Sequence, residues 1–377
     1  MRVLLLVAGL FVASHAFAFP DMVRHGYVSC ISCHTSMVGG GLLNEYGRSL
    51  AREVLSQKSL NGIPVAEGSE AFAYGVVKTP AWLLAGGDVR LLQYFEESKQ
   101  VSRARFFIMQ VDLEGSAQVT TQWRVFASLG RVEPKAANAT AKDFVTSSRH
   151  GVEYLFTKPD DQKRMAIRLG RFMPAYGINF AEHTFVTRRL LDFQPGYERY
   201  GAELSWSGTR NSVIATGIAS QADNNGIVEE KGGVVQAAMA WGEQSKLGLN
   251  YYQTERKDGA IQYSRRMMGA FAHLSLSKTW YSLIEADRIQ GADQKWGFVE
   301  IFKLGYELHQ GLHLIGAQEF ANLNLDESNP KFEAFSVGAE WFPRPHWDLL
   351  ALYRRERDTA LSNDFKDVGW LILHFYL

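Results

Sequence analysis

The sequence has few cysteines, few prolines and no excess of either charge. Its 377 residues include 2 cysteines and 10 prolines, and 40 basic residues balance 40 acidic ones. Two cysteines cannot build a scaffold of many disulfides, and a neutral chain lacks the basic excess of nucleic-acid-binding proteins. The apolar share of 46% and the aromatic share of 12% also argue against extensive disorder.

Long hydrophobic runs are also missing. After residue 18, no segment approaches the roughly 18 consecutive apolar residues that a membrane-spanning helix needs. The N-terminus combines Arg2, a short apolar run over 3–13 and the small-residue site Ala16-Phe17-Ala18. This run is too short for a membrane anchor, so the pattern predicts a signal peptide over 1–18 that is cleaved after Ala18. The mature chain is then soluble or spans a membrane as a barrel.

The rest of the chain divides into two unequal parts. A compact segment over 19–60 is followed by a linker rich in glycine and polar residues over 61–78, and then by the remaining 79–377. The first segment contains one predicted amphipathic helix over 42–57. That helix is indicated by residues spaced close to 3.6 apart: Leu43, Tyr46, Leu50 and Val54.

From residue 79 onward, apolar and polar residues alternate. About sixteen stretches with this period of two, most of about ten residues, run from 83–97 to 367–377. Strands of this length suit a tilted transmembrane barrel better than a soluble β-sandwich, whose strands average nearer five or six residues. We therefore predict an all-β fold, an outer-membrane β-barrel of about sixteen antiparallel strands, preceded by a small α-helical segment. A large soluble all-β protein is the alternative.

The connections between strands support a barrel. Short turns are predicted at Gly115-Ser116, Gly208-Thr209 and 243–245, and these alternate with long loops. Outer-membrane barrels have short turns on the periplasmic side and longer loops outside. The long loops are predicted over 132–148, 172–198 and 222–231.

The positions of the tryptophans and the C-terminal segment also indicate an outer-membrane barrel. The last segment ends in Tyr376 and Leu377 and is similar to the closing strand of bacterial outer-membrane barrels, although those more often end in phenylalanine. Indole rings prefer the interface between membrane and water. Tryptophans fall at the ends of the predicted strands: Trp206, Trp241, Trp280, Trp296, Trp341 and Trp347.

The two cysteines carry the predicted chemistry. Cys30 and Cys33 are three residues apart and His34 follows at once. In an exported protein this spacing indicates one covalently attached c-type haem, because two thiols so placed reach both vinyl groups of a porphyrin while the histidine faces the iron. A thioredoxin-like pair or a structural disulfide are the alternatives, but no βαβ pattern surrounds the motif. His34 is then the proximal iron ligand.

The distal ligand has three candidates. Met37 lies only three residues after His34, which makes the opposite haem face hard to reach, whereas His25 and Met22 lie upstream and are freer to wrap around. A histidine in this position gives a lower reduction potential than a methionine, so the choice bears on function.

Residues 19–50, placed before a predicted barrel, resemble the fused monohaem cytochrome-porin family, whose outer-membrane electron conduits include iron-oxidising cytochromes. The resemblance is carried by Gly26, the haem motif and Tyr46-Gly47-Arg48. Gly39-Gly40-Gly41 stands where a proline would be expected in that family.

This resemblance implies electron transfer across the outer membrane. The outer partner would be an extracellular donor or acceptor, Fe(II) or another metal ion among them, and the inner partner a periplasmic cytochrome or other electron carrier. An Fe(II) oxidase activity would follow only if Fe(II) is the donor. The rival hypotheses are an anion-preferring diffusion porin with a haem-bearing periplasmic appendage or sensor, and a soluble periplasmic cytochrome joined to a β-sandwich.

A second resemblance covers residues 170–177. This stretch is similar to the element of phosphate-selective-type porins that leads into a loop folded inside the pore. The residues that follow include basic side chains that could bind anions such as haem propionates, or could simply be solvated. They are His183, Arg188, Arg189 and Arg199. Outside the haem segment we interpret the histidines as strand-face or interface residues: His150, His183, His273, His309, His313, His346 and His374.

Overall fold

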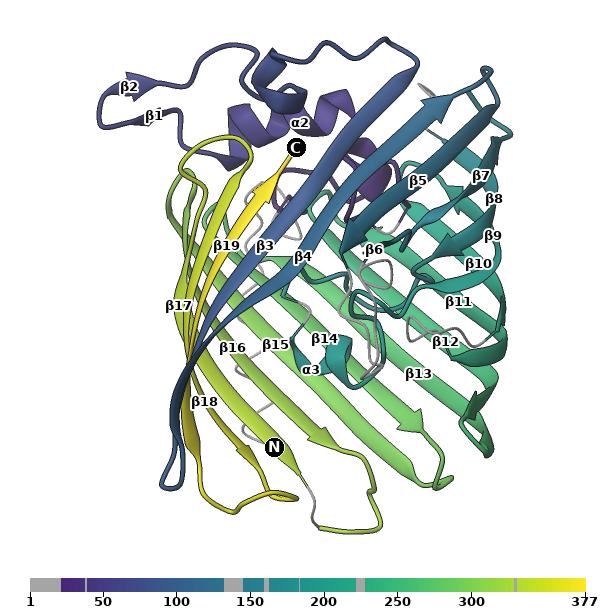
Figure 1. The fold of residues 1–377 in the computed structure, drawn as a ribbon, viewed down its shortest axis with the longest axis vertical. Coiled ribbons are helices and arrows are strands. Elements are labelled where there is room, and N and C mark those ends of the chain that lie inside the picture. The colour runs from purple at the N-terminus through teal and green to yellow at the C-terminus, as the bar shows by residue number, and fades with distance from the viewer. Residues whose placement is uncertain are drawn as a thin grey trace.

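The computed structural model describes residues 22–37, 39–131, 145–158, 163–182, 184–221, 228–328 and 331–377. Within them, sixteen long antiparallel strands and the two-residue strand β6 form one closed barrel (Figure 1). Strands adjacent in sequence pair with one another, and β19 pairs with β3 to close the ring. The predicted barrel is confirmed. The signal peptide predicted over 1–18 lies outside the described residues.

The short strand β6 pairs with the last two residues of β5, and β7 pairs with the earlier part of β5. Their bounds are β3 Leu83–Glu97, β4 Ser102–Gln118, β5 Trp123–Arg131, β6 Val145–Thr146, β7 His150–Leu155, β8 Arg164–Phe172, β9 Arg199–Ser207, β10 Asn211–Ser220, β11 Glu229–Trp241, β12 Ser245–Asp258, β13 Ile261–Ser275, β14 Trp280–Gln290, β15 Trp296–His309, β16 Leu312–Asn322, β17 Phe332–Trp341, β18 Trp347–Asp358 and β19 Lys366–Tyr376.

The strands turn their apolar side chains outward. On the paired strands β11 and β12, Val235 and Leu249 are exposed, whereas Gln236 and Asn250 are buried in the lumen and hydrogen-bond to each other at 3.0 Å. Successive side chains of a strand point to opposite faces, so the period of two read from the sequence separates an apolar outer wall from a polar lumen. This arrangement is the reverse of that in a soluble β-protein.

The six tryptophans predicted at strand ends lie there or one residue inside, whereas Trp370 lies in the middle of β19. Trp280 begins β14 and Trp241 ends β11, and Trp123, which is not among those six, begins β5. Trp123, Trp241 and Trp280 are about half exposed. Among the described residues, no helix is both long and apolar enough to cross a membrane.

The two ends of the barrel differ. Short connections, such as 208–210 and 242–244, lie at the end where the chain terminates, whereas the long connection 173–198 lies at the other end, together with short ones such as 259–260. The turn predicted at Gly115-Ser116 is wrong, because both residues lie inside β4. The turn follows at 119–122, where the Thr120 hydroxyl accepts a hydrogen bond from the amide of Trp123 at 3.0 Å.

Residues 22–58, which we call the plug, lie across the barrel end that also holds the C-terminus (Figure 1). The plug contains a 3-10 turn η1 (Cys30–Ser32), the α-helix α2 (Glu45–Leu50) and a π-helical turn η2 (Ala51–Leu55). The predicted small α-helical segment is therefore realised only as one short helix. Three consecutive glycines, Gly39, Gly40 and Gly41, have φ of 73°, 71° and 63°, a conformation incompatible with a right-handed helix.

Between the plug and β3 the chain forms a small hairpin and a 3-10 turn. The hairpin pairs β1 (Ser59–Leu60) with β2 (Ile63–Pro64), and the turn is η3 (Phe72–Gly75). Trp347 donates a hydrogen bond to the Tyr74 hydroxyl at 2.7 Å, so this connection packs on the barrel rim.

Candidate functional site

The Cys-x-x-Cys-His sequence folds into a single tight turn. The carbonyl of Cys30 accepts hydrogen bonds from the amides of Cys33 and His34, at 3.2 and 2.9 Å. Both thiols and the imidazole therefore project from one turn of backbone. The thiols are not joined to each other.

Asn44 ties this turn to helix α2. Its side-chain nitrogen donates to the carbonyls of Ile31 and Ser32 at 3.3 and 3.1 Å, and its side-chain oxygen caps the helix by accepting the amide of Gly47 at 2.8 Å. Asparagine is a favoured N-cap residue because its side chain satisfies an otherwise free amide of the first turn. The helix and the haem motif are thus held as one unit.

Gly47 allows the helix to lie against the motif. A Cβ at this position would come within 2.3 Å of the carbonyl oxygen of Cys33 and 2.9 Å of its Cα. Both atoms belong to the backbone and cannot rotate away. The glycine of the Tyr46-Gly47-Arg48 sequence is therefore explained by close packing on Cys33.

We predict that Gly47→Ala destabilises the plug by about 1–3 kcal/mol, because overpacking of this kind forces backbone to move. The plug should then become more sensitive to protease while the barrel stays intact. The matched control is Gly291→Ala, where a Cβ would meet nothing within 4 Å. Equal protease sensitivity of the two variants would contradict the packing argument.

The plug is fastened to several sides of the barrel. Arg24 forms an ion pair with Glu307 of β15 at 2.6 Å, and Arg124 of β5 donates to the carbonyl of Thr35 at 3.0 Å. Further contacts join the plug to the rim and to strands on other sides. They are Arg48 with the carbonyl of Ala85, Ser29 with Ser207, and Gln57 with the carbonyl of Phe342.

A second segment fills the lumen. Residues 173–198, which we call the inward loop, connect β8 to β9 and contain the short helix α3 (Val186–Arg189). Polar groups of the barrel wall hold the loop in place: Tyr176 donates to Asp287 at 2.8 Å, and Glu319 accepts the amide of Val186 at 2.7 Å. The predicted loop inside the pore is therefore present.

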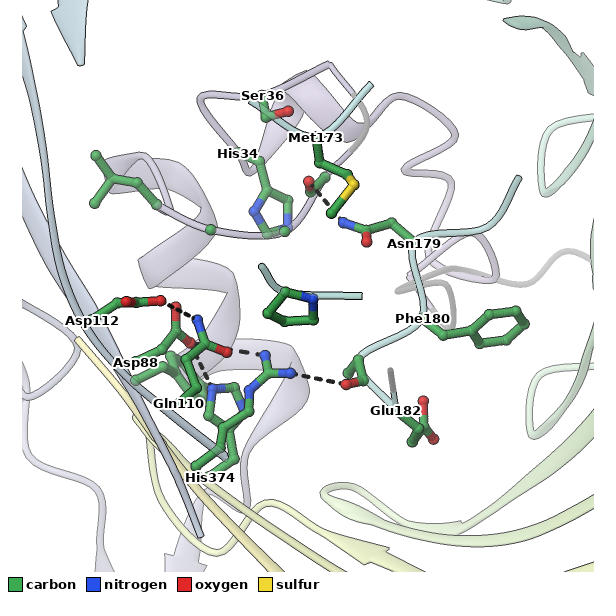
Figure 2. Close-up of a pocket in the computed structure, with 18 of the residues that line it drawn as sticks. His34, Ser36, Asp88, Gln110, Asp112, Met173, Asn179, Phe180, Glu182 and His374 are labelled. Carbon is green, nitrogen blue, oxygen red and sulfur yellow. Dashed lines mark hydrogen bonds and ion pairs between the residues drawn. The ribbon is translucent and has the colours of Figure 1, made fainter. Parts of the chain in front are cut away.

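A cavity of about 920 Å³ lies between the plug and the inward loop. Its lining includes Cys30, Cys33 and His34 from the plug and Met173 and Phe180 from the loop (Figure 2). The volume is at the upper end of the range of about 300–1,000 Å³ found for cofactor and small-molecule sites. The Cys-x-x-Cys-His turn thus lines a cavity large enough for a cofactor.

The inward loop also contacts the glycine run that packs beside the haem motif. Asn179 donates to the carbonyl of Gly39 at 3.1 Å and accepts from Arg188 at 2.9 Å. A Cβ on Gly39 would lie 3.6 Å from the Cys30 sulfur and 3.8 Å from the His34 ring. The glycine run therefore forms a narrow bridge between the loop and the motif.

The donor set fits a c-type haem. Burial lowers the pKa of His34 to about 4, so its imidazole is neutral, the form that ligates metals. Its Nδ1 is buried with no hydrogen-bond partner. Burial, with a smaller contribution from Cys30, raises the pKa of the Cys33 thiol to about 12. In the described residues, no cluster of three or more His, Cys, Asp or Glu side chains is arranged to hold a bare metal ion.

The three predicted distal candidates occupy different places. Met22 lines the cavity but packs into the plug's own apolar cluster, which also includes Cys33. Met37 is buried against Ala175 of the inward loop and does not line the cavity. His25 is half-buried in the plug and also lies away from the cavity lining.

The predicted loop arginines separate. Arg188 and Arg189 both line the cavity; Arg188 is buried, and Arg189 lies over the ring of Phe332. Arg199 is buried in an ion pair with Glu230 at 2.7 Å, away from the cavity lining. His183 lies outside the described residues.

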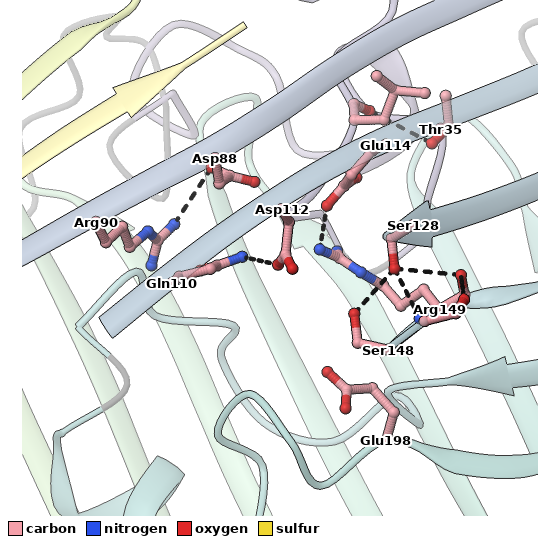
Figure 3. Close-up of polar contacts among 12 residues, drawn as sticks. Thr35, Asp88, Arg90, Gln110, Asp112, Glu114, Ser128, Ser148, Arg149 and Glu198 are labelled. Atoms are coloured by element: carbon pink, nitrogen blue, oxygen red, sulfur yellow. Dashed lines mark hydrogen bonds and ion pairs between the residues drawn. The ribbon is translucent and has the colours of Figure 1, made fainter. Parts of the chain in front are cut away.

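The cavity wall carries further charges that the sequence did not single out. Arg149 pairs with Glu114, and Gln110 donates to Asp112 at 2.6 Å (Figure 3). Alternation alone places these polar residues on the lumen face. It does not tell which of many lumen residues lie beside the plug.

Comparison with known proteins identifies the fold. No family model and no curated protein matches the chain. Similar solved structures include OprB of Pseudomonas putida (TM-score 0.60, 8% identity, 78% of this chain and 94% of that one) and OmpT, an outer membrane protein of Vibrio cholerae (0.55, 9%, 80% and 99%). An anion-selective porin from Comamonas acidovorans is also similar (0.52, 10%, 78% and 99%). The chain therefore has a porin-like barrel fold.

Proposed function

We propose that this protein is an outer-membrane monohaem c-type cytochrome fused to a porin-like barrel, and that it moves electrons across the membrane. The observation that carries the proposal is the Cys-x-x-Cys-His sequence on one turn of the plug, lining a cavity of about 920 Å³ inside a closed barrel. A bound haem would supply one-electron oxidation and reduction in a lumen that the plug and the inward loop narrow.

The residues present would hold one haem c. Each thiol, Cys30 and Cys33, would add its S–H bond across a vinyl group, forming a carbon–sulfur bond and placing the proton on the second vinyl carbon, with no leaving group. His34 would ligate the iron. The cavity's arginines, Arg149 and Arg188 among them, are suited to the two propionates.

The barrel suits the outer membrane. Its apolar outer face and the tryptophans at its strand ends match a lipid environment. Short turns face the periplasm in such barrels, which would place the plug, beside the short turns, on the periplasmic side. A periplasmic cytochrome or another electron carrier would meet the plug there, after export through the signal peptide.

Aromatic side chains extend from the cavity into the lumen. Phe193 lines the cavity and stacks on Tyr176 with ring centroids 5.0 Å apart, and Tyr252 follows at 6.0 Å from Phe193. Such short steps would help electrons reach the far side of a hydrocarbon layer of about 30 Å. The donor or acceptor there would be extracellular, and a metal ion such as Fe(II) is one candidate.

Redox titration of the purified holoprotein tests the proposal. The haem absorbance should respond to a reductant placed on either side of a proteoliposome membrane. Fe(II) is the first donor to try, and its failure to reduce the haem would remove the iron assignment without removing the conduit. A purified protein without covalent haem would contradict the proposal that the protein conducts electrons.

The second candidate is an anion-preferring diffusion porin. The porin-like fold and the arginines lining the cavity favour it. Conductance of the full-length holoprotein in a planar bilayer separates the two functions. A current far below that of an open porin supports the plugged conduit, and a large open-channel current supports the porin.

A further inference from the structure

Three described histidines line the cavity: His34, His273 and His374. They differ in how their ring nitrogens are satisfied. His374 is held at both nitrogens, by Asp88 at 2.7 Å and by Asp348 at 3.4 Å. Such a ring is not free to bind a cofactor.

His273 is different, because it is buried without a partner at Nδ1. Its side chain lies on the lumen face of β13 and is only 8% exposed, and Nδ1 has no hydrogen bond. Buried polar atoms are nearly always hydrogen-bonded, and one that is not calls for an explanation such as a missing ligand. The other buried cavity imidazole with an unpaired nitrogen is that of His34.

The barrel wall at His273 is the place that the haem motif touches. Lys246 of β12 is the register partner of His273, and its Nζ lies 4.0 Å from the sulfur of Cys30. Side chains of directly opposed residues stand on the same face with Cβ atoms about 4.5–5.5 Å apart. His273 therefore stands next to the wall contact of the motif, and Phe271 packs beside its ring, with centroids 5.7 Å apart.

We propose that His273 is the distal ligand of the haem iron, so that plug and barrel wall each supply one imidazole. This inference rests on the proposed function, since it requires a covalent haem. It gives a role to a buried imidazole that lines the cavity and lacks a hydrogen bond at Nδ1. It also makes the haem a bridge that joins the plug to β13, because His34 and the thiols belong to one part and His273 to the other.

The competing methionine is Met173. Its side chain lies at the same end of the cavity as His34 (Figure 2) and is partly buried. A thioether is a weak acceptor and costs little when buried without a partner. Met173 therefore needs no ligand to explain its position.

Electron paramagnetic resonance and near-infrared spectra of the full-length ferric holoprotein test the proposal. We expect the low-spin signal of two imidazoles and no sulfur-to-iron charge-transfer band. His273→Ala should lose the low-spin signal and regain it when imidazole is added. His273→Met should gain the sulfur band and raise the reduction potential. A sulfur band in the wild type, or an unchanged spectrum in His273→Ala, would overturn the assignment.

Two control variants make the test specific. His313→Ala removes a buried interior histidine that does not line the cavity, and Met173→Ala removes the competing thioether. Both should keep the wild-type spectrum, and a changed spectrum in Met173→Ala would assign the ligand there instead. If His273→Ala does not assemble, the spectra of the wild type and of Met173→Ala still show whether the distal ligand is an imidazole or the thioether of Met173. Haem staining after denaturing electrophoresis reports the thioether bonds alone, so its absence in the wild type would signal failure of the proposed function.

Discussion

Cys33→Ser should reduce covalent haem to background while the barrel remains assembled. A serine hydroxyl does not form the thioether, and we expect haem attached only through Cys30 not to accumulate, because attachment through both vinyl groups is what the spacing of Cys30 and Cys33 allows. The barrel should persist, because its hydrogen bonds run between strands and the wall contact of Lys246 is to Cys30 rather than Cys33. Electron flux across proteoliposomes should fall with the haem.

Haem staining after denaturing electrophoresis and the heat-dependent mobility of the folded barrel measure the two expectations separately. The control is Ser49→Ala, in the same helix as Gly47, where the hydroxyl donates to the carbonyl of Glu45 in its own helix at 3.2 Å. An unchanged haem stain in Cys33→Ser would refute the attachment. Unchanged electron flux without haem would refute the conduit.

Arg24→Ala should loosen the plug and raise the channel conductance several-fold. Arg24 is only 3% exposed and pairs with Glu307 at 2.6 Å, and it also donates to the carbonyl of Lys278 at 3.3 Å. Removing one partner of a buried ion pair costs about 3–5 kcal/mol, because the other charge is left uncompensated. The plug would then leave the barrel mouth more often, and planar-bilayer recordings would register the openings.

The matched control is Arg52→Ala. Arg52 is also a plug arginine with two acidic partners, but these are Glu53 and Glu70, which lie in the same N-terminal part of the chain. Its loss should leave the conductance at the wild-type level. Equal conductance in the two variants would mean that the ion pair with β15 does not hold the plug.

Much of the fold could be predicted from local pattern. The alternation of apolar and polar residues predicts the strands, and the strand length predicts a barrel, because each rests on residues close together in sequence. The prediction of a turn at Gly115-Ser116 was wrong because it also rested on a local pattern. A Gly-Ser pair is compatible with both strand and turn. The turn forms four residues later, where the Thr120 hydroxyl accepts a hydrogen bond from the amide of Trp123.

The helical part was harder to predict. The spacing of Leu50 and Val54 predicts a regular helix over 42–57, yet the α-helix ends at Leu50 and continues as a π-helical turn. Most helix stability comes from tertiary packing rather than from intrinsic propensity. In this segment the packing is against Cys33 and the barrel rim.

The sequence by itself determined that the chain forms a barrel, and it contains the Cys-x-x-Cys-His pattern at Cys30, Cys33 and His34 from which a haem was predicted, because both features depend on residues close together in the chain. Only the tertiary structure decided which lumen residues face that motif. Lys246 and His273 are more than 200 positions away, on strands whose alternation resembles that of every other strand. Ring closure and strand register set their distance from Cys30, and both depend on contacts between residues remote in sequence.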